Sequence, residues 1–209
     1  MEVRLPQEEA PNPHIVNFEA LPPSFPTHRH SVEFWEGLGR LVATFGFLEE
    51  ILGKAIFAFT ATREYSEDEV EAEFEAWLPT LQRALNEPLN PLVTAYSQAV
   101  RNHHAPPLDE ASLDELVRQL RQVATLRNAI CHGSWRQAPD SEGRSVPFYV
   151  DRRLGIFGDP IDLQYLQSLQ RSVAELACDV MNTVTLLGWQ FPGSKGLGEP
   201  IFARRDTNS

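Results

Sequence analysis

Arg127, Asn128 and His132 lie together near the end of a segment with the apolar spacing of an amphipathic helix. Asn128 and His132 are four residues apart, which places their side chains on one helical face, with Arg127 beside them. They supply a fixed positive charge, a neutral amide and an imidazole that titrates near neutral pH. This set suits cleavage of a phosphodiester, because the imidazole can move protons while the guanidinium stabilises the anionic phosphorane. RNA carries its own nucleophile, the 2′-hydroxyl, so we predict no metal and no cofactor.

The arginine stands where the helix pattern calls for an apolar residue. The apolar seam of this helix consists of Leu113, Leu116, Leu120, Val123 and Ile130. Arg127 falls within that seam and cannot lose its charge, so it needs either a carboxylate partner or a cavity. Glu49 and Glu50, in an earlier helical segment, are the candidate partners. One interpretation is therefore a buried ion pair that fixes the helix register, and the other is a functional site.

A long helix is expected to begin after Ser31, which can cap it, and to reach about Thr60. Its apolar seam is Leu38, Leu41, Phe45, Leu48, Leu52, Ala55 and Phe59. A second stripe of the same helix has only small side chains, at Gly39, Ala43, Gly46 and Gly53. Small residues allow another helix to approach closely, which favours an inner position in a bundle or a subunit contact.

Capping-box patterns, S-x-x-E, begin at Ser66 and Ser112 and predict the starts of two more helices. The first is expected to reach about Leu85, and the second carries the Arg127 motif. A shorter helix, introduced by a proline-framed turn at 88–91, is expected to end near residue 104. Gly133 is predicted to end the motif helix by adopting the left-handed conformation.

Residues 134–158 contain "VPFYVDRRLGIFG", which is rich in aromatic and β-branched residues and predicts a small β-hairpin. Asp159 and Pro160 predict the start of a last helix that runs to about Trp189. The fold class expected is an all-α bundle of four or five helices with this hairpin before the last helix. The domain would span residues 31–190, between a proline-rich extended arm (1–30) and a loosely ordered tail (191–209).

The formal net charge is −11, which argues against sequence-blind binding to nucleic acid. Residues 118–153 nevertheless carry seven arginines and three acidic residues, a net charge of +4. Arg121 and Arg136 belong to this basic segment and are the candidate RNA contacts, although chance clustering on a solvated face remains an alternative. The two cysteines lie in helical patterns, no signal peptide is apparent and no stretch is apolar enough to span a membrane. We therefore expect a cytoplasmic protein.

Other residues were considered as sites. The histidines at 28–30 and 103–104 lack the spacing of a closed metal site, and we interpret them as solvated loop or helix-end residues. Cys131 adjoins His132, but neighbours on a helix point about 100° apart, which disfavours a thiol–imidazole pair. Trp135 is interpreted as a core anchor, with base stacking left open because it follows the motif so closely.

The stretch "RNAICH" resembles the R-x4–6-H motif of the HEPN superfamily. Residues 126–133, "LRNAICHG", are also similar to LRNxxxHG, one of the usual surroundings of that motif, in which a polar residue follows the arginine. The segment "FGFLEE" is similar to the first helix of such bundles. The resemblance implies a metal-independent endoribonuclease whose two subunits place both motifs in one cleft and leave a 2′,3′-cyclic phosphate. It assigns phosphate stabilisation to Arg127, acid–base catalysis to His132, orientation to Asn128, and support to Glu49, with Glu50 beside it.

The resemblance also implies partners and alternatives. Such a protein would act on selected RNAs as a homodimer, as a toxin or defence effector restrained by an antitoxin or another regulatory protein. A subset of the superfamily has a tyrosine two positions after the histidine, where this chain has Ser134, so regulation by modification at that position is not expected. Other members bind nucleotides or proteins without cleaving RNA, and a non-catalytic module of this kind is the alternative function.

Overall fold

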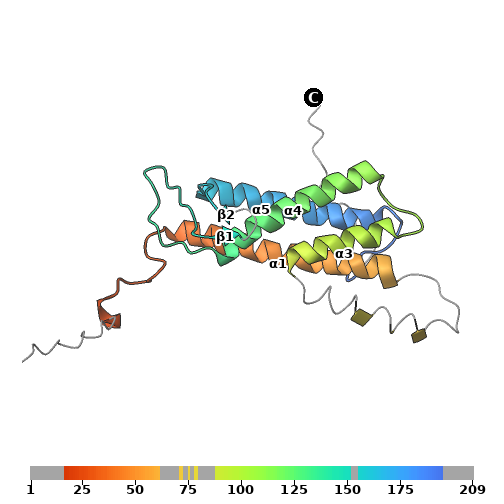
Figure 1. The fold of residues 1–209 in the computed structure, drawn as a ribbon, viewed down its shortest axis with the longest axis horizontal. Helices are drawn as coiled ribbons and strands as arrows, with labels where there is room; N and C mark the ends of the chain where they lie inside the picture. Colours follow the sequence, from red (N-terminus) through yellow and green to blue (C-terminus); the bar gives the residue numbers. More distant parts are fainter. Residues whose placement is uncertain are drawn as a thin grey trace, which may run out of the picture.

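The computed structural model describes residues 17–61, 71–72, 75, 78–79, 88–151 and 155–194. These residues form the long helices α1 (Val32–Ala61), α3 (Leu89–Arg101), α4 (Glu110–His132) and α5 (Leu163–Thr185), the hairpin strands β1 (Val150–Asp151) and β2 (Gly155–Ile156), and one 3-10 turn, η1 (Phe18–Ala20). The fold is thus all-α with a small hairpin before the last helix, as predicted (Figure 1).

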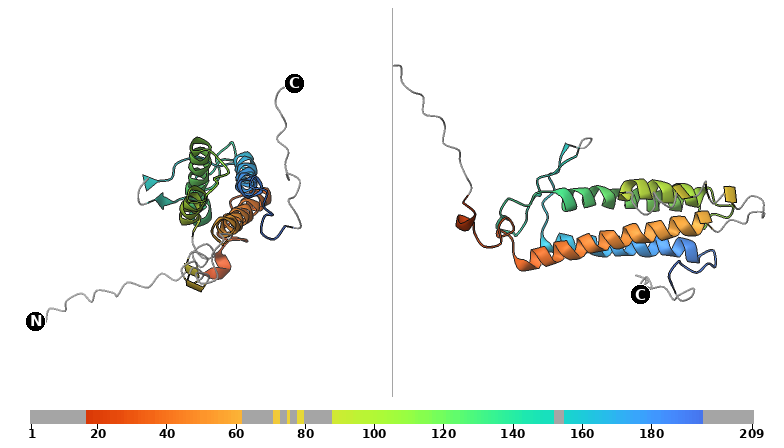
Figure 2. Two further views of the ribbon diagram at one scale, coloured as in Figure 1. Left: turned by 90° about the vertical axis from the view of Figure 1, so that its right-hand side faces the viewer. Right: turned by 90° about the horizontal axis from the view of Figure 1, so that it is seen from below.

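Helix α1 runs along the length of the bundle and packs against α5 and α3 (Figure 2). Ser31 caps it as predicted, since its Oγ accepts a hydrogen bond from the Phe34 N–H at 3.2 Å. All seven residues of the predicted apolar seam are buried. The small-residue stripe is different: Gly39, Ala43 and Gly46 are exposed. A Cβ atom added at Gly39 or Gly46 would meet nothing within 4 Å. Gly53, the fourth residue of the stripe, is half-buried. The first three residues are therefore open to solvent, and a subunit contact there stays a prediction.

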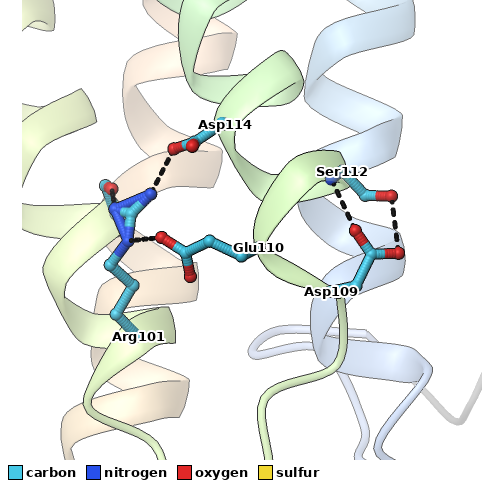
Figure 3. A network of polar contacts seen from close by, with 6 residues as sticks. Arg101, Asp109, Glu110, Ser112 and Asp114 are labelled. Carbon is cyan, nitrogen blue, oxygen red and sulfur yellow. Dashed lines mark hydrogen bonds and ion pairs between the residues drawn. The ribbon is translucent and has the colours of Figure 1, made fainter.

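The N-cap of helix α4 lies three residues earlier in the sequence than the capping-box pattern predicts. Asp109, not Ser112, is the N-cap: its carboxylate accepts hydrogen bonds from the Ser112 N–H at 2.8 Å and the Ser112 Oγ at 3.0 Å (Figure 3). Beside this cap, Arg101 at the end of α3 forms ion pairs with Glu110 and Asp114 (Figure 3). The junction between α3 and α4 is therefore held by polar contacts, and α3 ends at Arg101 instead of near residue 104.

Helix α5 begins later than predicted. Its N-cap is Asp162, whose side chain accepts a hydrogen bond from the Tyr165 N–H at 2.7 Å, so the prediction from Asp159 and Pro160 is wrong by three residues. The reason is that Ile161 is held extended by Ser145, with which it exchanges two backbone hydrogen bonds of 2.8 Å. The helix also ends at Thr185, before the predicted Trp189.

Much of the helix expected between residues 66 and 85, including its capping box, lies outside the described residues. Those that are described there, 71–72, 75 and 78–79, are helical. Of the two flanks of the domain, only 17–30 and 191–194 are described, and residue Phe191 of the latter is buried in the core. None of the described helices combines the length and apolar character needed to cross a membrane.

Candidate functional site

The last two turns of α4 carry the predicted motif at the surface of the bundle. Arg127 and Asn128 are half-buried and His132 is exposed. Val123 and Ile130, on either side of Arg127 in the seam, are buried. The arginine therefore lies at the edge of the core, where its side chain is 21% exposed.

Gly133 ends α4 as predicted, but the predicted left-handed conformation is wrong. Its φ of −70° and ψ of 145° are extended, and its N–H donates to the Ala129 carbonyl at 2.9 Å. The glycine is required for space instead. A Cβ atom at this position would lie 2.6 Å from the Pro147 Cβ, and still closer to the Ala129 carbonyl oxygen. The hairpin segment thus packs directly on the end of the motif helix.

The Arg127 guanidinium is the centre of the site. Its Nη1 lies 3.1 Å from His132 Nε2 and 3.4 Å from Asn128 Oδ1. Because a guanidinium can only donate hydrogen bonds, His132 Nε2 must be the acceptor. The imidazole is then neutral, with its proton on Nδ1 and its Nε2 lone pair directed at the arginine. This is the tautomer in which Nε2 can accept a proton from a substrate hydroxyl once the arginine has moved aside.

Glu49 of α1 approaches the same guanidinium from the opposite helix. Arg127 Nη2 lies 3.4 Å from Glu49 Oε1, and the two side chains are 21% and 27% exposed. This ion pair lacks hydrogen-bond geometry: the buried Oε1 has no hydrogen-bond partner among the described residues. The structure therefore contains the ion pair that the sequence suggested, but in a loose form at the border of the core.

Glu50, the other predicted supporting residue, is not part of this cluster. It is exposed and pairs with Lys54, four residues along α1, at 2.6 Å. Consecutive residues on a helix point about 100° apart, so only one of the two glutamates can face α4. The structure selects Glu49.

The two candidate RNA contacts lie on either side of the motif. Arg121 is exposed on α4, seven residues before Asn128, so the two share a helical face about 10 Å apart along the axis. Arg136 lies beyond the helix, with its guanidinium carbon 5.7 Å from the ring centroid of Phe148. Phe148 was not predicted as a site residue, and its side chain is 54% exposed.

Two neighbours of the motif are structural. Burial raises the pKa of the Cys131 thiol, with smaller effects from Arg127 and Glu49, which keeps the thiol protonated at neutral pH and disfavours a nucleophilic role. Trp135 is 8% exposed, and its indole N–H donates to the Ile130 carbonyl at 3.4 Å. Trp135 is therefore a core anchor and cannot stack on a nucleobase in this conformation.

Two of the remaining histidines were expected to be solvated, and the structure corrects this. His103 is 6% exposed, and its ring packs on Phe59 and Trp189. Its Nδ1 lies within hydrogen-bonding distance of the Ala105 backbone. His30 is half-buried against Phe34 and Trp135. Within the described ranges, no group of three or more histidine, cysteine, aspartate or glutamate side chains is arranged to hold a metal ion.

No family model matches this chain, and neither a curated protein nor a solved structure matches it. The functional interpretation therefore depends on the chemistry of the site itself and on the resemblance of its motif.

Proposed function

We propose that this chain is a metal-independent endoribonuclease of the HEPN type, with Arg127 and His132 as its catalytic residues. The observation that carries the proposal is the 3.1 Å contact between Arg127 Nη1 and His132 Nε2 at the surface end of α4. A phosphate-binding cation and an acid–base group within hydrogen-bonding distance of each other can act on a single phosphodiester. The exposure of His132 leaves the pair open to a macromolecular substrate.

The proposed reaction is an internal transfer. The RNA 2′-hydroxyl attacks the adjacent phosphorus, the bond from phosphorus to the 5′-oxygen breaks, and the products are a 2′,3′-cyclic phosphate and a 5′-hydroxyl. One imidazole takes the 2′-hydroxyl proton and an acid returns a proton to the leaving oxygen. Arg127 stabilises the charge that develops on the phosphorane oxygens, and Asn128, half-buried beside it, orients the guanidinium or the substrate.

A homodimer supplies the second acid–base group. One neutral His132 cannot both accept and donate a proton in one concerted step, whereas two copies facing one cleft provide a base and an acid. The uncovered small-residue stripe of α1 supports this arrangement, because Gly46 and Gly53 lie three and four residues from Glu49 and border the site. Close approach of a second α1 at this stripe would bring the two motifs together.

Substrate selection would follow from charge. The whole chain carries −11, so general attraction to RNA is weak, and Arg121 and Arg136 would provide local positive charge beside the motif. A protein partner such as an antitoxin would restrain the activity. These features favour a narrow set of RNA targets over general degradation.

Cleavage of RNA in EDTA by the purified protein and by His132→Ala tests the proposal. We expect the parent protein to cleave and the variant to lose activity by about 10²-fold or more. His104→Ala is the matched control, since His104 is also exposed but lies just beyond α3. Absence of cleavage by the parent protein on any RNA, or equal rates for the parent and His132→Ala, would refute the assignment.

The alternative is a non-catalytic nucleotide-binding or protein-interaction module of the same fold. The ion pair of Arg127 with Glu49 favours it, because the guanidinium already has an internal counter-charge. This alternative predicts no cleavage, together with a rise in melting temperature when a nucleotide or a protein partner is added.

A further inference from the structure

We propose that one face of the hairpin, next to the motif, binds an unpaired nucleobase of the RNA substrate. This base platform consists of Phe148, with the Arg136 guanidinium over its ring, extended by Val150 and Ile156. The inference deepens the proposed function and rests on it: it names a residue pair outside the motif that recognises one base of the substrate RNA.

The platform is an apolar face that is largely open to water, apart from the Arg136 guanidinium over the Phe148 ring. Val150 and Ile156 are cross-strand partners in the hairpin, and Phe148 precedes Val150 by two residues, so the three side chains point to the same side. Phe148 is 54% exposed, Val150 54% and Ile156 72%. Three adjacent apolar side chains held open to water on a two-stranded hairpin add little to the stability of the fold, and such patches typically mark binding surfaces.

Backbone hydrogen bonds fix the platform relative to His132. Ser134 and Phe148 exchange two of them, of 3.0 and 2.9 Å, so their Cα atoms are about 5.5 Å apart. Ser134 follows His132 by two residues, a span of at most about 7 Å. The Phe148 Cα atom therefore lies within about 12.5 Å of the His132 Cα atom. A nucleotide bound at His132 and its neighbour in the same strand can reach both places.

The groups around Phe148 favour RNA over a protein partner. The Arg136 guanidinium carbon lies over the Phe148 ring, 5.7 Å from its centroid. Arg29 donates a hydrogen bond to the Arg136 carbonyl at 3.3 Å, which places a second guanidinium beside the Arg136 backbone. An aromatic ring flanked by arginines combines a stacking surface for a base with positive charge for the phosphates, in a chain that is otherwise acidic.

Stacking on Phe148 requires a base that is free of its own helix. In an RNA duplex the base faces are covered by neighbouring pairs, whereas in loops and single strands they can be splayed onto an aromatic side chain. The platform therefore selects unpaired segments, and it places cleavage one or two nucleotides from the stacked base.

Binding of a short fluorescent single-stranded RNA of mixed sequence, measured by anisotropy in a His132→Ala background, separates the platform from catalysis. We expect Phe148→Ala to weaken binding about tenfold or more, which corresponds to the loss of one stacked base. Phe148→Trp should bind as tightly as the parent. Phe47→Ala removes an equally exposed ring (42%) from α1 and should change nothing. The same RNA annealed into a duplex should bind weakly to all four proteins.

The outcomes distinguish the platform from the nuclease. The parent protein could bind single-stranded RNA more tightly than duplex RNA, in a way that depends on Phe148, and yet cleave no RNA. This result would support the platform and refute the nuclease. Cleavage by a Phe148→Ala variant with parental rate, affinity and base preference would refute the platform and leave the nuclease in place. No RNA binding by any variant, or capture by Phe148 of a protein partner without an effect on RNA, would also refute it. If Phe148→Ala has a lower melting temperature than the parent, Phe148→Trp and Arg136→Gln test the platform in its place. Phe148→Trp should then bind the RNA as tightly as the parent, and Arg136→Gln should bind it more weakly.

Discussion

Glu49 Oε1 lies 3.4 Å from Arg127 Nη2, while Nη1 of the same guanidinium lies 3.1 Å from His132 Nε2. The arginine is thus shared between a carboxylate from α1 and an imidazole on its own helix. A phosphate that binds Arg127 must compete with both. In the absence of substrate the guanidinium is therefore occupied by contacts within the protein. Glu49 and His132 should each affect substrate binding in a separate way.

Replacement of Glu49 by glutamine should tighten RNA binding. The amide keeps the shape of the side chain but removes the negative charge that opposes a phosphate at Arg127. We expect up to about a fivefold decrease in Kd, the range of a partly exposed ion pair. Glu50→Gln is the matched control, because Glu50 pairs with Lys54 and should leave Kd unchanged. Weaker binding by Glu49→Gln would show that the carboxylate is needed to position the guanidinium.

The ion pair should contribute little to the stability of the fold. Arg127→Met alone leaves the buried Glu49 oxygen without a counter-charge and should cost about 1–3 kcal/mol of unfolding free energy. Adding Glu49→Leu should restore most of that loss, because apolar replacement of both partners is often neutral or stabilising. Chemical denaturation of the three proteins measures this. A double variant that unfolds as easily as Arg127→Met would mean that the pair itself holds α1 and α4 together.

Substitution of Gly133 by alanine should both destabilise the protein and disturb the motif. The added Cβ would press on Pro147 at 2.6 Å and on the last turn of α4, so the hairpin segment or the helix end must move. A cost of about 1–3 kcal/mol is expected for such overpacking. Gly158→Ala provides the comparison, since a Cβ there meets nothing within 4 Å. Equal melting temperatures for the two variants would contradict the packing argument.

His30 should make the stability of the protein depend on pH. Burial lowers the pKa of its imidazole, which packs on Phe34 and Trp135 and hydrogen-bonds through Nε2 to Ser145 Oγ at 2.9 Å. The unfolded chain therefore takes up this proton at a higher pH than the folded chain does. Stability is complete above about pH 6.5, the ordinary value, and decreases as pH falls toward the lowered pKa.

His30→Gln removes the titrating group and retains a hydrogen-bond donor for Ser145. Its unfolding free energy should therefore decrease less than that of the parent over the same pH interval, as measured by urea denaturation at several pH values. The exposed His28→Gln controls for the loss of one histidine. Parallel curves for the parent and His30→Gln would exclude His30 as the source.

The sequence predicted the parts of the fold that depend on local periodicity. The α1 seam, the α4 seam and the hairpin are where apolar spacing and residue type placed them. The prediction failed where a helix end depends on backbone that is distant in the sequence. Ile161 pairs with Ser145, and α5 therefore starts after Asp162 instead of after Asp159. The start of α5 is set by this tertiary contact, which leaves no pattern in the local sequence.

The candidate site was only partly readable for a similar reason. Arg127 interrupting an apolar seam indicated that something must meet its charge, and Glu49 was among the expected partners. Whether Glu49 or Glu50 would do so depends on the rotation of α1 about its axis. The exposure of Phe148 could not be predicted either, because an apolar residue in a strand is as consistent with a covered face as with an open one.

The two backbone bridges of the hairpin segment have a consequence for how chains of this type can vary. Ser134 lies two residues after the end of α4 and Ile161 two residues before the start of α5, and each is paired with a residue inside the segment. Length changes can therefore be tolerated in its outer loops, but trimming it back to a plain connector would also remove the pairing that holds the two helix ends. The segment therefore connects the end of α4 to the start of α5 through backbone pairing. In related chains that lack it, other contacts must stabilise the end of the motif helix.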